Sequence, residues 1–133
     1  MPDNPSPLAI IVAAAAYMAV GAVWYAPRIL GNKWLSLIGK TRQELGALWR
    51  PMILASLAAL VLAYTLSLLI VAMEIDSFVE GVLFGFLIGA GIFAAALAPI
   101  MAYEGRPRQL FTLYAGNVVV GMMVMGAILA AWR

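Results

Sequence analysis

The sequence contains no cysteine and no histidine among its 133 residues. Disulfide bonds, thiolate nucleophiles, axial haem histidines and zinc sites of the usual cysteine or histidine kind are therefore excluded. Charged residues are also scarce, at 11% of the chain against about 25% in an ordinary soluble domain. No nucleophile–base pair, glycine-rich phosphate loop or metal-spaced set of carboxylates is visible. We therefore expect no catalytic residues, no metal site, no cofactor and no nucleic acid partner.

Hydrophobic residues make up 65% of the sequence. This composition indicates an integral membrane protein, and the length predicts one domain, residues 1–133. Four apolar stretches are long enough to cross about 30 Å of hydrocarbon as helices. They cover approximately residues 7–26, 51–73, 77–102 and 108–132. The predicted fold is all-α, an integral membrane four-helix bundle.

The ends of these spans carry helix-capping signals. Ser6 before Pro7 is a typical start, and Ser77 with Glu80 has the form of a capping box. Gly105 suits the position after a helix, whereas Pro99 should kink the third span or tighten its last turns. The short connections at 74–76 and 103–107 predict antiparallel neighbours.

The connection 27–50 is long and mixes apolar with basic residues. Asn32 is expected to cap a short helix that ends at Gly39. Thr41 and Glu44 form a second capping box, which predicts another short helix toward Trp49. We expect one or two amphipathic helices lying in the membrane interface.

Basic residues predict the orientation. Seven lie on one side of the predicted membrane and only Arg133 on the other, where the turn 74–76 is acidic. Both termini are therefore expected outside the cytoplasm. The basic and aromatic rim suits contact with anionic lipid head groups or a partner. Its expected anchors are Trp24, Tyr25, Arg28, Lys33, Trp34, Trp49, Arg106 and Arg108.

Small residues recur every four positions in two spans, as Gly81, Gly85 and Gly89 and as Ala55, Ala59 and Ala63. Such faces allow helices in lipid to approach closely. The glycine ladder suits packing within one bundle or, as the alternative, a seam between two protomers. The predicted bundle is compact and has no large central cavity.

Polar residues inside the spans are few. Asn117, Tyr17 and Tyr64 are the buried polar candidates, and Asn117 is expected to form an interhelical hydrogen bond with one of the tyrosines rather than contact a ligand. Glu80 is better explained as a cap than as a proton or cation site.

The stretch GAVWYAPRILGNKWLSLIG carries Gly21, Trp24, Tyr25, Gly31, Trp34 and Gly39. It resembles the N-terminal signature of a bacterial family of unknown function, DUF family 1761. The last helix, RPRQLFTLYAGNVVVGMMVMGAILAAW, is similar to that of the family. The chain departs from the pattern at Asn117, near which members often have a Tyr-His pair. The resemblance implies a four-span protein of the bacterial inner membrane and no assigned activity.

Three hypotheses of function follow. The first is a non-catalytic membrane protein that forms a homo-oligomer or serves as a subunit of a larger membrane complex, and it requires the least. The second is a transporter or channel for a small neutral or lipophilic compound, which needs a cavity between the spans. The third is a lipid-modifying enzyme at the basic rim, which loses its base if Glu104 pairs with Arg106 or Arg108.

Overall fold

A computed structural model describes residues 5–132 of the chain, which form helices and turns without any strand. Four helical runs in this part are long and apolar enough to cross a membrane: Pro7–Trp24, Trp49–Ala72, Phe78–Tyr103 and Arg108–Ala131. These bounds lie close to the four predicted spans. The complete order of elements is α1 (Pro7–Trp24), η1 (Pro27–Gly31), α2 (Asn32–Ile38), η2 (Gln43–Leu45), α3 (Trp49–Ala72), α4 (Phe78–Ile88), η3 (Gly89–Ala94), α5 (Ala95–Tyr103) and α6 (Arg108–Ala131).

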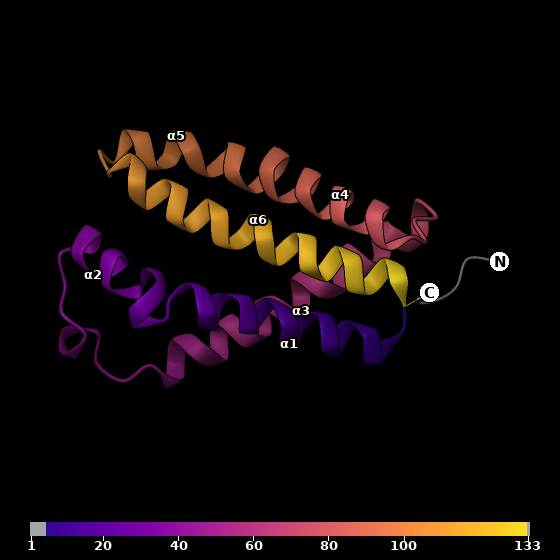
Figure 1. Cartoon of the computed structure of the whole chain (residues 1–133), viewed down its shortest axis with the longest axis horizontal. Helices are drawn as coiled ribbons and strands as arrows, with labels where there is room; N and C mark the ends of the chain where they lie inside the picture. Colours follow the sequence, from indigo (N-terminus) through magenta and orange to yellow (C-terminus); the bar gives the residue numbers. More distant parts are fainter. Residues whose placement is uncertain (1–4, 133) are drawn as a thin grey trace.

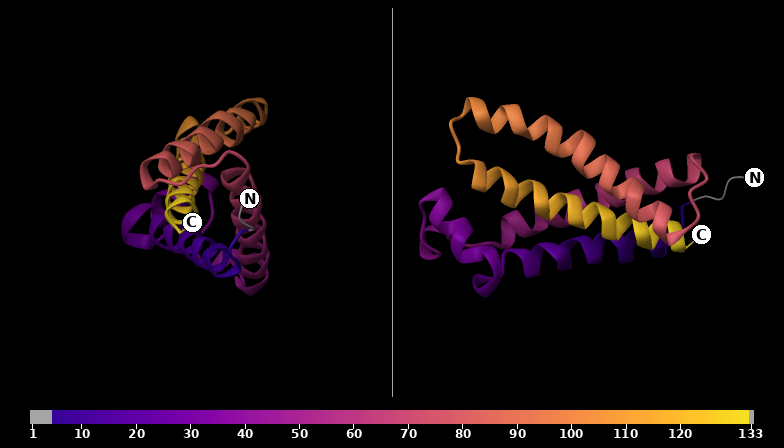
Figure 2. Two further views of the ribbon diagram at one scale, coloured as in Figure 1. Left: turned by 90° about the vertical axis from the view of Figure 1, so that its right-hand side faces the viewer. Right: turned by 45° about the horizontal axis from the view of Figure 1, so that its top comes forward.

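The last helix, α6, lies at the centre of the bundle. It runs between α4 and α5 on one side and α1 and α3 on the other (Figure 1). Half of its apolar window is buried, a larger share than in any other span. The views in Figure 2 show α3 crossing behind α1 and α6 at an angle rather than running parallel to them. The bundle is therefore organised around α6, which α3 contacts less extensively than α4 and α1 do.

Helix starts follow the sequence signals. The Ser6 side chain accepts a hydrogen bond from the Ala9 amide at 3.3 Å. The Ser77 hydroxyl accepts from the Glu80 amide at 3.2 Å and donates to the Glu80 carboxylate at 2.8 Å. Gly105 has a φ of +71° after the end of α5, as the predicted position requires. These predictions of helix ends are confirmed.

The connection between α1 and α3 differs from its prediction in two places. Asn32 is not a cap, because the helical turn η1 runs directly into α2 and Asn32 makes no side-chain capping bond. The Thr41–Glu44 capping box forms, but it opens only the three residues of η2. Gly46, with a φ of +69°, then takes the chain out of helical geometry.

The third span is irregular upstream of its proline. Pro99 lies inside α5, and the wide π-helical turn η3 comes just before that helix. The prediction that Pro99 tightens the last turns of the span is not confirmed, because α5 continues as a regular helix past the proline to Tyr103. The irregular turn of this span is a widened one, upstream at Gly89–Ala94.

The glycine ladder of α4 and η3 faces α6 of the same chain. A Cβ on Gly81 would meet the Gly126 carbonyl, and one on Gly85 would meet the Met122 carbonyl. A Cβ on Gly89 would lie 2.9 Å from the Val119 Cα. Backbone therefore packs directly on backbone along this contact, which has no room for a methyl group.

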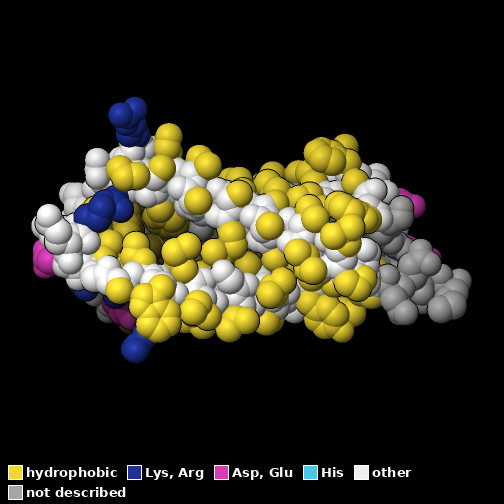
Figure 3. Space-filling model, turned by 90° about the horizontal axis from the view of Figure 1, so that it is seen from below, with side chains coloured by type: hydrophobic (Ala, Val, Ile, Leu, Met, Phe, Trp, Pro, Cys, Tyr) yellow, Lys and Arg dark blue, Asp and Glu magenta, His cyan; other side chains and the backbone are white. Residues whose placement is uncertain are grey.

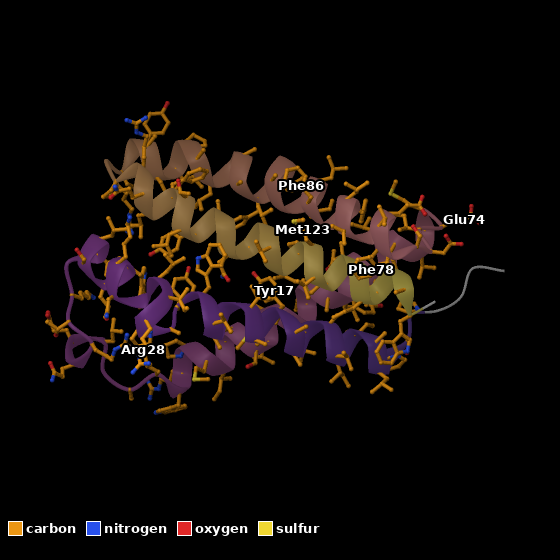
Figure 4. All side chains as sticks on the ribbon, viewed as in Figure 1. Tyr17, Arg28, Glu74, Phe78, Phe86 and Met123 are labelled. Carbon is orange, nitrogen blue, oxygen red and sulfur yellow. The ribbon has the colours of Figure 1, made fainter. Side chains whose placement is uncertain are left out.

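The two ends of the bundle carry opposite charge. Arg28 lies at one end and Glu74 at the other (Figure 4). We call the end formed by residues 25–50 and 103–108 the basic end, and the end formed by residues 73–80 the acidic end. Figure 3 shows basic side chains gathered at one end of a largely hydrophobic surface. Arg133 and the amino-terminal group, on which the predicted orientation also depends, lie outside the described residues.

Candidate functional site

A large apolar hollow opens between α1, α3 and α6 in the half of the bundle nearer the basic end. We call it the α1–α3 hollow. It is lined by α1 residues between Ala15 and Tyr25, by α3 residues between Met52 and Leu62, and by Asn117 of α6. Its volume is about 660 Å³, within the roughly 300–1,000 Å³ of typical small-molecule sites. The prediction of no large central cavity did not foresee this open space on the side of the bundle.

The hollow exists because α1 and α3 diverge. Near the acidic end both helices bury small side chains in one core cluster, with Ala13 and Ala14 from α1 and Ala59 and Ala63 from α3. The long connection 25–48 then allows α3 to begin well away from the end of α1. Every α3 residue before Ala59 is exposed. Two helices that touch at one end and are joined loosely at the other leave a wedge-shaped space.

Three polar side chains reach this otherwise apolar space. They are Tyr17 in the second half of α1, Tyr25 directly after α1, and Asn117 of α6. The Tyr17 ring lies on Gly121, where an added Cβ would come within 2.6 Å of it, and Figure 4 shows this side chain between α1 and α6. The Asn117 Oδ1 lies above Gly21, 3.8 Å from the position of an added Cβ. Gly121 thus makes room for the Tyr17 ring, whereas the Asn117 side chain is at ordinary contact distance from Gly21.

The predicted hydrogen bond from Asn117 to a tyrosine is absent from the described residues. The side-chain amide of Asn117 and the hydroxyls of Tyr17 and Tyr25 make no hydrogen bond to another described residue. Tyr64 is 52% exposed on α3, so it is not one of the buried polar residues. The physical reason is that α3 turns Ala63, Leu66 and Ser67 toward the core and leaves Tyr64 outside. Three polar groups therefore have free hydrogen-bonding capacity around the hollow.

Two tryptophans attach the end of α1 and the start of α2 to α6. The Trp24 indole N–H donates to the Leu113 carbonyl at 3.0 Å, and its ring occupies the space above Gly116. The Trp34 indole N–H donates to the Tyr114 hydroxyl at 3.3 Å. Tyr25 meets the edge of Trp34, with ring centroids 5.4 Å apart. These contacts hold Tyr25, which lines the α1–α3 hollow, in a fixed position.

Gly31 makes the wide helical turn between α1 and α2 possible. Its amide donates to the Ala26 carbonyl at 2.9 Å, a bond that closes the π-helical turn η1. A Cβ at this position would meet the carbonyl oxygen of Tyr25. Glycine is therefore required here for close approach of two backbone segments.

The charged residues of the basic end are mostly unpaired. Glu104 pairs with Arg106 at 2.8 Å, the one ion pair between described residues. The Arg50 guanidinium lies 5.1 Å from the Trp49 ring centroid, which is a cation–π distance. Glu104, the carboxylate that the third hypothesis would use as a base, is the one that pairs with Arg106. Among the described residues, no three acidic side chains gather as a metal site would require.

A family described as "Protein of unknown function (DUF1761)" matches residues 8–130. The chain belongs to this family. The resemblance seen in the sequence is thereby confirmed over nearly the whole chain. Neither a curated protein nor a solved structure matches the chain.

The family signature now has a structural explanation. Trp24, Tyr25 and Trp34 form the aromatic attachment to α6, and Gly31 permits the turn between them. Gly39 ends α2 with a φ of +73°. In this chain the signature residues hold the basic end together, with Tyr25 also lining the α1–α3 hollow.

Sequence reasoning identified the polar residues of the hollow but missed the hollow itself. Asn117 and Tyr17 stood out because polar groups are costly in hydrocarbon. Met52, Ala58 and Leu62 could not be recognised as lining residues from the sequence. An apolar residue on a span gives the same sequence pattern whether it faces a neighbouring helix, lipid or a cavity. Ala55 belongs to the predicted packing ladder yet is exposed and lines the hollow, whereas Ala59 and Ala63 are buried.

Proposed function

We propose that this chain is a non-enzymatic integral membrane protein that binds a small lipophilic compound in the α1–α3 hollow. The observation that carries the proposal is an apolar space of about 660 Å³ in which Tyr17, Tyr25 and Asn117 have unused hydrogen-bonding groups. An apolar site with a few convergent polar groups is the usual form of a small-molecule site. The compound should therefore combine an apolar body with a hydroxyl, carbonyl or amide group.

The membrane setting is part of this proposal. Four helices have the length and apolar composition of membrane spans. With basic side chains at one end and acidic ones at the other, we place the basic end in the cytoplasm and both termini outside, in a bacterial inner membrane. On this orientation η1 and α2 lie at the cytoplasmic surface, and the hollow opens sideways to the inner leaflet.

A direct test is the identification of co-purifying molecules. The protein would be purified from native membranes in mild detergent, and its organic extract analysed by mass spectrometry. Ala55→Phe should fill the hollow and deplete one lipophilic species from the extract. Ala72→Phe is the matched control, since Ala72 is also exposed on α3 but lies outside the hollow. Equal recovery of every extracted species from both variants would contradict the proposal.

A role as a homo-oligomer or as a subunit of a larger complex is the second candidate. The first half of α3 supports it, because each residue from Trp49 to Ala58 is exposed. This half of the helix includes Ala55, a member of the small-residue ladder with no partner helix within the chain. Cross-linking in native membranes followed by purification would test it, and a lone monomer would count against it.

A further inference from the structure

A second recess lies at the basic end, beside Trp24. It is an open recess of about 180 Å³, lined by Trp24, Leu30, Lys33, Gln109, Thr112 and Leu113. A larger open depression of about 550 Å³ adjoins it, lined by Pro107, Arg108, Gln109 and Thr112. Gln109 and Thr112 belong to both, so the two form one continuous surface, which we call the basic recess. It shares no lining residue with the α1–α3 hollow.

The polar side of the basic recess offers hydrogen-bond donors and positive charge without a carboxylate. Lys33 and Arg108 form no ion pair with any described residue, since Glu104 is already paired with Arg106. The Gln109 amide makes no side-chain hydrogen bond in the described part of the chain. The Thr112 hydroxyl donates to the Arg108 carbonyl at 3.1 Å, which leaves the two charged groups and Gln109 available to an anion.

The other side of the basic recess is apolar and rigid. Trp24 is held by its hydrogen bond to Leu113 and by its packing on Gly116. Leu30 and Leu113 complete this side. A ligand that matches both sides must have an anionic group next to an apolar chain. The recess also lies where α1 ends and α6 begins, at the depth expected for lipid head groups on the proposed orientation.

We infer that the basic recess binds the phosphate head group of an anionic phospholipid. Lys33, Arg108 and Gln109 contact the phosphate oxygens, and the first part of an acyl chain lies against Trp24 and Leu30. Basic side chains attract anionic lipids in general. Lys33 and Arg108, two of the seven basic residues at this end, account for the preference for anionic lipid, because only these two border the recess.

Native mass spectrometry of the detergent-solubilised protein tests the inference. Phosphatidylglycerol and phosphatidylcholine of the same chain length would be added separately, and the dissociation constant of the first bound lipid measured. The wild type should bind phosphatidylglycerol at least tenfold more tightly. Lys33→Gln with Arg108→Gln should weaken that binding about 25-fold, or fivefold for each basic side chain. Lys33→Arg with Arg108→Lys should keep most of it.

The matched control is Lys40→Gln with Arg42→Gln, which removes the same charge at the same end but from residues outside the basic recess. This control should change the affinity by less than twofold. Equal weakening by both double variants would overturn the inference in favour of general attraction. Soluble glycerol 3-phosphate at millimolar concentration should not displace the lipid. Displacement would overturn the lipid assignment and indicate a soluble phosphate ligand instead.

Discussion

The half of the bundle near the acidic end and the half near the basic end are built from similar residues but pack differently. Near the acidic end, Gly81 lies against Gly126, and Ala59 and Ala63 share a core with alanines of α1. Near the basic end, Ala55 and Ala58 of the same helix α3 are exposed beside a hollow. Small side chains therefore permit close approach without causing it. The long segment between α1 and α3 allows these two helices to diverge toward the basic end, where their small side chains no longer meet.

The half near the basic end is held by specific hydrogen bonds instead of close packing. Trp24 and Trp34 donate hydrogen bonds to the backbone and side chain of α6. These bonds fix α1 and α2 relative to α6, whereas no such contact holds the first half of α3. The close-packed half should therefore determine stability, and the open half should determine binding.

The largest effect should come from adding a methyl group within the close-packed contact. Gly85→Ala should destabilise the protein by about 1–3 kcal/mol, because the new Cβ meets the Met122 backbone, which has no side-chain freedom to move away. Gly91→Ala is the matched control in the same span, with only the end of Leu87 nearby at 3.8 Å. The control should be neutral or stabilising by up to about 1 kcal/mol, since alanine favours helix. Denaturant unfolding in detergent measures both, and equal stability would contradict backbone-on-backbone packing.

A smaller loss is expected when the aromatic attachment is weakened. Trp24→Phe removes the hydrogen bond to the Leu113 carbonyl and part of the packing on Gly116, at a cost of about 1 kcal/mol. Trp49→Phe should cost less, since Trp49 is 58% exposed and donates no hydrogen bond to a described residue. The same unfolding assay compares them. If Trp49→Phe were the more harmful, the attachment would not hold the basic half.

Asn117→Leu should separate stability from binding. Asn117 has no described side-chain partner, so an apolar residue of similar size should leave the free energy of unfolding unchanged or raise it by about 1 kcal/mol. The variant should nevertheless lose the lipophilic species recovered with the wild type. Tyr64→Phe provides the control and should alter neither, because Tyr64 faces outward. A clear destabilisation by Asn117→Leu would show that the Asn117 side chain forms a stabilising hydrogen bond and would contradict its free state.

The smallest effect concerns pH and the turn η2. The Thr41 amide and hydroxyl hold the pKa of the Glu44 carboxyl below its usual range. The pKa of Glu44 is lower in the folded protein than in the unfolded chain. The stability that this cap contributes is therefore fully present above the unfolded-state pKa, and it is lost as the pH falls through the lower folded-state pKa. Thr41→Ala should raise the Glu44 pKa toward its usual value. An NMR titration of the labelled carboxyl measures this, and an unchanged pKa would show that the capping box does not form in solution.

The spans and their ends followed from the sequence, because span length and capping residues act locally. The short turn 74–76 was expected to make its two helices packed neighbours, but α3 and α4 do not pack on each other. The position of Ser77 before Glu80 and of Gly105 after the third span is enough to place two helix ends. The divergence of α1 and α3 could not be predicted in this way. It depends on where Trp49 begins α3 in space, which the intervening 25–48 segment sets through the turn at Gly31 and the positive φ of Gly46. Ala55, Ala59 and Ala63 follow one regular spacing in the sequence. In the bundle, however, Ala55 is exposed whereas Ala59 and Ala63 are buried.

The most direct test of the α1–α3 hollow uses a long-chain alcohol that carries a photoreactive diazirine. The protein in phosphatidylcholine bilayers would be irradiated with this probe, digested and sequenced by mass spectrometry. We predict that adducts concentrate on residues that line the hollow, such as Met18, Met52 and Leu62, and that Asn117→Leu reduces them. The labelling of Leu54, which is 69% exposed on α3 but does not line the hollow, should not change. Labelling spread evenly over all exposed faces, and indifferent to Asn117→Leu, would contradict a binding site in the hollow.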